Sequence, residues 1–276
     1  MARPLLLSPI LFALLGISAC TQSLGTAHTP PVTVPEATAS PAKTTAALPA
    51  ASSGCDHPFG LYDNAELVYD LTDGDGKKAG QLIQRVVRLG TETNKKQTHT
   101  TTTVLLKSGL YDAKSKLLRL HDLTFACQRD TAFTDGMDEL GSDALNSFRG
   151  RIFHYIPTHL AWPNNPTIGT TLPNGGVVVE ISSTAVDIAQ VSATQKNRRV
   201  VGGPETVTTP AGAFQCYKVE SEYETGTVAH VDIVVRKTAH EVTYYSPAVG
   251  IVRTECYAKN KLVRVQVLAA RRGMPQ

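Results

Sequence analysis

The chain has 276 residues, 42% of them hydrophobic and 18% charged, and 27 Lys and Arg against 24 Asp and Glu give a net charge of +3. This small charge is scattered along the chain, which excludes the basic stripe with interleaved aromatic residues that is typical of nucleic-acid-binding proteins. The length allows one large all-β domain after a targeting segment.

Residues 1–19 have the pattern of a bacterial lipoprotein signal peptide. Arg3 precedes an apolar stretch over residues 5–17 that is too short to span a membrane, and the tetrad ISAC ends at Cys20. In such signals the cysteine receives a diacylglyceryl thioether and becomes the acylated N-terminus after cleavage. We therefore predict lipidation of Cys20 and anchoring in the bacterial cell envelope; the alternative is an ordinary secretory signal peptide. Thr21 is not acidic, which favours the outer membrane.

Residues 20–54 are predicted to be the lipidated cysteine followed by a disordered tether. After Cys20 they are mostly Thr, Ala, Pro, Ser and Gly, with prolines at positions 30, 31, 35, 41 and 49. Too few large apolar groups are present to offset the entropy cost of ordering this segment. Residues 55–276 show no comparable shift in composition, so we predict that they form a single β domain.

Four cysteines remain once Cys20 is assigned to lipid: Cys55, Cys127, Cys216 and Cys256. An even number in an exported chain predicts two disulfides, for which three connectivities exist. We favour Cys55 with Cys127 and Cys216 with Cys256, because the last two lie in similar strand contexts. The alternative is four free buried thiols. The spacing does not fit a zinc site.

From residue 66 onward, Val, Ile, Thr, Tyr and Leu recur with a period near two, and Gly, Asn, Asp and Pro mark the turns. This pattern predicts about eleven strands, at residues 66–71, 80–89, 97–107, 116–127, 177–183, 186–201, 214–224, 226–236, 240–246, 250–258 and 262–268. One short helix is predicted at residues 137–148, and a Pro-rich connection at residues 157–176.

Successive strands with short turns predict a mainly β, antiparallel fold. A sheet of so many strands twists and curls until it partly encloses its apolar face. We therefore expect a half-barrel or open barrel with a concave apolar side, covered by the helix and the Pro-rich connection as a lid.

Residues that could carry chemistry have simpler explanations. Asp70, Asp73 and Asp75 resemble the start of a calcium loop, but no glutamate follows at the bidentate position, so a hairpin turn is favoured. His154 and His159 flank Pro157, which prevents the helix that would make them a two-histidine metal face.

No serine has the glycine-flanked elbow of a hydrolase. Aromatic residues could line a ligand site, although core packing is the favoured interpretation: Trp162, Tyr217, Tyr223, Tyr244, Tyr245 and Tyr257. We predict no catalytic residue, no metal site and no cofactor, and a hydrolase is a minor alternative.

Several segments resemble one family. Residues 205–219, ETVTTPAGAFQCYKV, and residues 244–255, YYSPAVGIVRTE, resemble two strand motifs of the TapB-like bacterial lipoproteins. Residues 72–80 and 168–173 and the position of Cys127 also match. Ala248 replaces a usual glycine, and the tether is longer than a soluble carrier needs. These proteins are similar to the LolA/LolB lipoprotein carriers, which implies a curled sheet around an apolar cavity with a helical lid, and a tethered acceptor like LolB.

The function predicted from these features is non-enzymatic binding of a lipid, an acylated protein or another hydrophobic ligand in the cavity of an envelope lipoprotein. On this hypothesis the cavity is lined by Val, Ile, Leu and Phe and contains no buried charge. The alternative is a structural or assembly lipoprotein that holds a protein partner and whose interior is filled by its own side chains.

Overall fold

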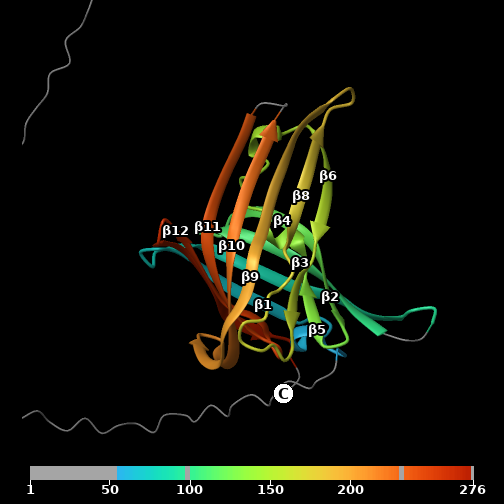
Figure 1. The fold of residues 1–276 in the computed structure, drawn as a ribbon, viewed down its shortest axis with the longest axis vertical. Coiled ribbons are helices and arrows are strands. Elements are labelled where there is room, and N and C mark those ends of the chain that lie inside the picture. Colours follow the sequence, from blue (N-terminus) through green and yellow to red (C-terminus); the bar gives the residue numbers. More distant parts are fainter. Residues whose placement is uncertain (1–54, 97–99, 230–232, 275–276) are drawn as a thin grey trace, which may run out of the picture. The chain divides into compact units, whose positions relative to one another are not determined.

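The computed structural model describes residues 55–96, 100–229 and 233–274, so Cys20 and the predicted signal and tether lie outside the described residues. The described part contains thirteen strands and three short 3-10 helices (Figure 1). The strands are β1 (Glu66–Asp73), β2 (Lys78–Thr93), β3 (Thr100–Asp112), β4 (Leu117–Gln128), β5 (Thr131–Thr134), β6 (Ile152–Thr158), β7 (Leu160–Pro163), β8 (Gly175–Ser182), β9 (Asp187–Thr209), β10 (Gly212–Ala229), β11 (Ile233–Ser246), β12 (Gly250–Ala258) and β13 (Lys261–Arg272). The 3-10 helices are η1 (Pro58–Gly60), η2 (Gly136–Glu139) and η3 (Asn146–Phe148).

All strands belong to one antiparallel sheet, in the order β6-β8-β9-β10-β11-β12-β13-β1-β2-β3-β4-β5-β7. The two strands at the ends of this order, β6 and β7, follow each other in the chain with only His159 between them. β6 pairs with β8, and β7, which follows it directly in the chain, pairs with β5. The two ends of the strand order are therefore joined by one bent stretch of chain, which nearly closes the sheet into a barrel. In Figure 1 the long strands β9, β10 and β11 run steeply, whereas β2 and β3 cross the view. The predicted curled antiparallel fold is confirmed.

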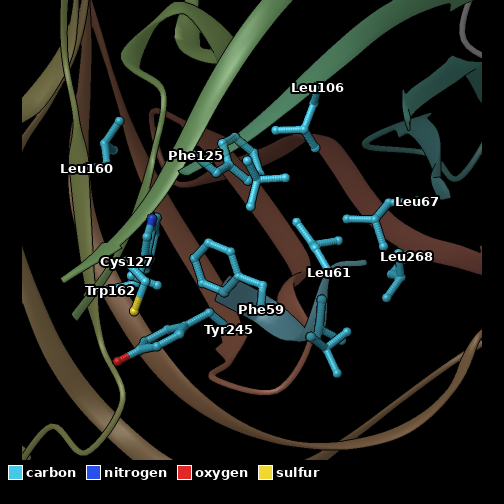
Figure 2. Packing of buried hydrophobic residues seen from close by; sticks show 14 of the residues in the cluster. Phe59, Leu61, Leu67, Leu106, Phe125, Cys127, Leu160, Trp162, Tyr245 and Leu268 are labelled. Carbon is cyan, nitrogen blue, oxygen red and sulfur yellow. The ribbon is translucent and has the colours of Figure 1, made fainter. Parts of the chain in front are cut away.

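The interior holds two groups of buried apolar side chains. The larger takes residues from η1 and from the inner faces of β1 to β5, β7 and β9 to β13, and includes Phe59, Leu67, Phe125, Trp162 and Tyr245 (Figure 2). The smaller lies on β8 and β9, where Leu140 and the partly buried Leu145 and Phe148 pack against Val177, Val179 and Ile181. The connection from η2 to η3 is thus part of the core and covers one region of the inner face.

The predicted helix at residues 137–148 is wrong. Gly141, Ser142 and Asp143 interrupt its apolar pattern, and Asp135 accepts a hydrogen bond from the Met137 backbone N–H at 2.9 Å, which begins a single 3-10 turn. Leu140, Leu145 and Phe148 all reach the smaller core without helical spacing, because irregular backbone brings them to the same surface.

Strand boundaries differ from the prediction around the long hairpin. Residues 214–224 and 226–236 were expected to be separate strands, but β10 continues through Gly226 to Ala229, and Ala229 pairs with Ile233 of β11. Gly226 does not mark a turn, because it pairs with Arg236 of β11. The absence of a side chain at Gly226 makes room for the Ser192 hydroxyl of β9. The short strands β5, β6 and β7 were not predicted; Pro157 lies within β6, which ends the strand order and has one unpaired edge.

The Asp-rich turn between β1 and β2 is a hairpin, as predicted. The Asp73 carboxylate accepts hydrogen bonds from the backbone N–H groups of Asp75 at 3.1 Å and Lys77 at 2.9 Å. Its acceptor oxygen therefore holds the turn together, as side chains of this type commonly do.

Of the two favoured disulfides, the structure contains Cys55–Cys127, with the Cα atoms 5.2 Å apart. Cys216 and Cys256 are free and buried, so their predicted pairing is wrong. The register explains this result: Tyr217 pairs with Tyr245, whereas Cys256 pairs with Glu241. The two cysteines therefore lie about 16 Å apart along the strand direction, much farther than a disulfide can reach.

Candidate functional site

A cavity of about 320 Å³ lies between the inner face of the sheet and the segment that begins with η2. It takes side chains from strands at both ends of the sequence, because β1 and β13 are neighbours in the sheet. The cavity is therefore a product of the closed topology and is not confined to one hairpin.

One part of the cavity lining is apolar. Phe59 of η1, Leu67 of β1 and Phe125 of β4 are almost fully buried there (Figure 2). Further apolar side chains extend this lining: Leu71, Leu82, Leu110, Leu118, Leu140, Trp162, Val249 and Ile251. Leu118 is 48% exposed, so it lies where the cavity meets solvent. We call this set the apolar lining.

The other part of the lining carries three acidic side chains, Asp138, Glu139 and Glu241, which we call the carboxyl cluster. The side-chain amide of Gln195 donates to Glu241 at 2.7 Å and to Glu139 at 3.1 Å, so one nitrogen joins the two carboxyl groups. Glu241 is only 2% exposed. A guanidinium nitrogen of Arg264 lies 3.8 Å from the second oxygen of Glu241.

Asp138 is held by residues of β2 and β4. The Gln84 amide donates to one carboxylate oxygen at 2.9 Å, and an Arg119 guanidinium nitrogen lies 3.8 Å from the other. That second oxygen is buried without a hydrogen-bond partner. Tyr223 donates its hydroxyl to the Glu139 backbone carbonyl at 2.7 Å. Polar contacts from β2, β9 and β10 thus hold η2 in place against the sheet.

Burial changes the acidity of the carboxyl cluster. Loss of solvation, followed by the negative charges of Glu241 and Asp138, raises the pKa of Glu139 to about 8. Burial also raises the pKa of Glu241 and of Asp138, although nearby arginines act in the opposite direction. Glu139 therefore keeps its proton at neutral pH, when an exposed glutamate would be ionised.

Arg198 stabilises the wall behind the cluster. Its guanidinium donates to the backbone carbonyls of Pro173 and Ala161, both at 3.0 Å, and lies 4.5 Å from the centre of the Trp162 ring. The residue is fully buried, and loss of solvation lowers its pKa to about 10. These contacts attach β7 and the connection between β7 and β8 to Arg198 of β9.

Several residues considered from sequence do not line the cavity. His154 lies 3.2 Å from Glu180 on the exposed part of β6 and β8, and His159 occupies the bend between β6 and β7. Burial raises the pKa of the Cys216 and Cys256 thiols, so they remain protonated and weakly nucleophilic. Across the residues that the structure describes, no group of three or more His, Cys, Asp or Glu is placed to hold a metal ion.

Sequence reasoning missed the carboxyl cluster and its partners. Glu241 follows the same alternation as the inward-facing Thr243 and Tyr245, which was a usable signal for an inward charge. Asp138 and Glu139 lie in the segment that the sequence predicts to be a short helix. The expectation of a cavity without buried charge is wrong, because the connection carries two carboxyl groups into the interior. Trp162 packs in the core and also borders the cavity.

The family model described as DUF3108-like matches residues 64–268. The chain belongs to the DUF3108-like family. The matched range includes β1 to β12, the first part of β13 and every member of the carboxyl cluster. The resemblance to TapB-like lipoproteins and to the LolA/LolB carriers is more specific than this assignment and stays a prediction.

Two crystal structures are similar to this DUF3108-like chain. One is of a candidate lipoprotein from Parabacteroides distasonis, with 22% identity and a TM-score of 0.60 over 79% of this chain and 100% of that chain. The other is of a candidate exported protein with a YmcC-like fold from Bacteroides fragilis, with 23% identity and a TM-score of 0.60 over the same shares. At these identities the likeness shows the fold alone. No curated protein matches the sequence.

In the described ranges, no helix has both the length and the apolar character needed to cross a membrane.

Proposed function

We propose that this DUF3108-like protein is a lipid-anchored envelope protein that binds an amphiphile, a molecule with one apolar and one polar part, in its interior cavity. The observation that carries the proposal is the composition of the lining, in which large apolar side chains and a hydrogen-bonded carboxyl cluster border the same space. The candidates are a lipid, the acyl group of a lipoprotein or another hydrophobic ligand with a polar end.

The energetics support a ligand of this kind. Each methylene group that leaves water for the apolar lining contributes about 0.8 kcal/mol. A purely apolar ligand would leave the buried Asp138 oxygen without a partner and would remove water from Glu139 and Glu241, which is costly. A polar end group that reaches the carboxyl cluster removes this penalty. The cavity volume is also within the range of small-molecule sites.

The anchoring part of the proposal rests on Cys20 and the signal pattern before it. A similar fold occurs in a candidate lipoprotein and in a candidate exported protein, which is consistent with an envelope location. On this proposal the chain acts as a tethered binder, as the resemblance to LolB implies. It performs no chemistry on its ligand, and Thr21 favours the outer membrane.

Native mass spectrometry of the mature chain tests the binding proposal. The mature chain with Cys20→Ser is exported behind an ordinary secretory signal peptide in place of residues 1–19 and purified from the periplasm without detergent. Bound molecules are then extracted with organic solvent. We expect a stoichiometric amphiphile to leave with the protein. A mass equal to that of the bare chain, unchanged after incubation with an envelope lipid extract, would contradict the proposal.

A matched pair of substitutions on neighbouring strands locates the ligand. Leu110 lines the cavity, so Leu110→Trp fills part of it and should reduce the bound fraction at least about fivefold. Leu120 is 54% exposed and does not line the cavity, so Leu120→Trp should leave the bound fraction unchanged. Equal occupancy in both variants would place the ligand elsewhere.

A further inference from the structure

Four polar side chains from β3, β4 and η2 meet beside the cavity, and we call them the inner polar patch: Ser108, Arg119, His121 and Asp138. Ser108 pairs with His121 across the two strands, and Arg119 lies two residues from His121 on the same face. An Arg119 guanidinium nitrogen lies 3.8 Å from an Asp138 carboxylate oxygen. Arg119 and Asp138 line the cavity, so the cavity reaches the patch.

Each residue of the inner polar patch has a buried polar atom without a hydrogen-bond partner: Ser108 Oγ, Arg119 Nε, His121 Nδ1 and Asp138 Oδ1. Eight such side-chain atoms occur in the described ranges, so half of them lie here. Ser108 is 1% exposed, and strand alternation places its side chain on the same inner face as Leu110, which lines the cavity. Buried polar atoms nearly always have a partner, so these four require partners from outside the chain.

We propose that the amphiphile has a neutral head group with several hydroxyl groups, as in a glycerol or sugar unit, which binds the inner polar patch while its apolar chain lies along the apolar lining. This inference rests on the proposed function and names its ligand class. The 3.8 Å between Arg119 and Asp138 is too long for a hydrogen bond. One hydroxyl oxygen between them can accept from the guanidinium and donate to the carboxylate.

The unpartnered atoms include donors and acceptors, which favours hydroxyl groups. Arg119 Nε donates, a carboxylate oxygen of Asp138 accepts, and Ser108 Oγ does both. Burial, followed by the charge of Arg119, lowers the pKa of His121, so its ring is neutral at neutral pH and offers one donor and one acceptor nitrogen. An ammonium group has no acceptor and a carboxylate has no donor, whereas a hydroxyl group has both.

The charges around the cavity also favour a neutral head group. Each of the two guanidinium groups that line it faces a carboxyl group at 3.8 Å. Glu139 keeps its proton at neutral pH, and Asp143 is exposed to water. Arg198 does not line the cavity and donates to two backbone carbonyls. An ionised head group would therefore meet no unpaired opposite charge at the inner polar patch.

Four probes share an eight-carbon chain and differ in the head group: octylglycerol (an ether), octanol, octylamine and octanoate. The protein is the full mature chain with Cys20→Ser. Trp162, the single tryptophan of the chain, is 2% exposed and borders the cavity, so its fluorescence reports occupancy. At neutral pH we expect octylglycerol to bind at least about tenfold more tightly than octylamine and octanoate, with octanol between them.

The outcomes distinguish the two proposals. Octylamine or octanoate binding as tightly as octylglycerol would overturn the inference and leave amphiphile binding intact. No binding by any of the four probes would overturn the proposed function together with the inference. Free glycerol shares the head group and lacks the chain, so it should bind far more weakly; glycerol binding as tightly as octylglycerol would overturn the proposed function, because the apolar lining would then contribute nothing.

A serine pair tests the patch directly. Ser108→Ala removes one hydroxyl group, so it should reduce octylglycerol affinity about fivefold and leave octylamine affinity within about twofold. It should not lower the thermal unfolding midpoint of the ligand-free protein, because the Ser108 hydroxyl has no partner there to lose. Ser246→Ala is the control, since Ser246 is also buried but does not line the cavity, and it should leave octylglycerol affinity unchanged. An unchanged octylglycerol affinity in Ser108→Ala, or a lowered midpoint, would overturn the inference.

Discussion

Glu139 is a cavity residue whose acidity differs strongly from that of an exposed glutamate. Loss of solvation is the main cause of its raised pKa, and the facing charges of Glu241 on β11 and Asp138 on η2 add to the effect. Gln195 on β9 and Arg264 on β13 act in the opposite direction without reversing it. Glu139 is therefore one of the groups through which pH acts on the interior, together with Asp138 and Glu241.

We expect Glu139→Gln to change the pH dependence of stability. In the native protein the pKa lies near 8, against an ordinary value of 4.5, so the folded state holds the proton more tightly. The stability that this proton provides is fully present below pH 4.5 and is lost as pH rises through 8. Relative to the wild type, the variant should gain stability between pH 5 and pH 8 in urea unfolding. A constant difference across this range would show that Glu139 does not bind the proton.

The free thiols give a second test at the scale of single residues. Cys216 and Cys256 are buried, so a thiol reagent should react with neither in the folded Cys20→Ser chain and with both after unfolding without reductant. Two reactive thiols per chain are expected in denaturant, because Cys55 and Cys127 are joined. A count of zero would show that the second disulfide forms after all.

Among the elements, η2 decides whether the site exists, since it carries two of the three carboxyl groups. It packs closely because Gly136 has no side chain: a Cβ atom there would overlap the backbone carbonyl oxygens of Gly176 on β8 and Thr158 on β6. The element that completes the cavity is therefore fixed by a close backbone contact as well as by the hydrogen bonds of Asp138 and Glu139.

We expect Gly136→Ala to destabilise the fold by about 1–3 kcal/mol, because backbone atoms must move to make room. Gly90→Ala on β2 is the matched control, since a Cβ atom there would meet nothing within 4 Å. Chemical denaturation of both variants measures the difference. Equal midpoints would mean that η2 can shift without cost.

The disulfide acts on a larger element, the stretch of chain between its cysteines. It closes a segment of 72 residues and joins the start of the domain to the end of β4. Chain-entropy arguments assign about 4 kcal/mol to a loop of this length. Cys55→Ser with Cys127→Ser should therefore lower the unfolding free energy by about 2–5 kcal/mol in denaturant titration. A loss below about 1 kcal/mol would indicate that η1 is held mainly by the packing of Phe59.

For the whole molecule, closure of the sheet and the proposed attachment to a membrane are the two properties that matter. The pairing of β1 with β13 places residues from both ends of the described sequence around one cavity. On our proposal, the lipid at Cys20 keeps this cavity at the envelope, where amphiphiles are concentrated.

Metabolic labelling with a radioactive fatty acid tests the anchor. The wild-type chain should incorporate label and sediment with membranes, and Cys20→Ala should lose both properties because the acylated sulfur is absent. Cys216→Ala, which removes a buried thiol far from the signal, should retain label. Membrane association of an unlabelled Cys20→Ala chain would point to a different mode of attachment.

The sequence by itself determined the fold class, and its local pattern predicts lipidation of Cys20. Alternation of apolar residues predicts the strands, because successive side chains in a strand point to opposite faces, and the pattern ending at Cys20 predicts lipidation. The structure differs from this prediction in the long hairpin, in the 3-10 turns and in the strands β5 to β7. In these places the sheet contains a glycine or a proline, or the backbone is irregular, and neighbouring strands still pair with the chain.

Only the tertiary structure decided the cysteine pairing and the character of the cavity. Cys216 and Cys256 have similar neighbours in sequence, yet the register of β10, β11 and β12 keeps them apart. Glu139, Gln195 and Glu241 are far apart in the chain and converge because β9 and β11 both pair with β10 and η2 packs against this part of the sheet. Local pattern specifies which face a side chain occupies, whereas register and closure specify what it meets there.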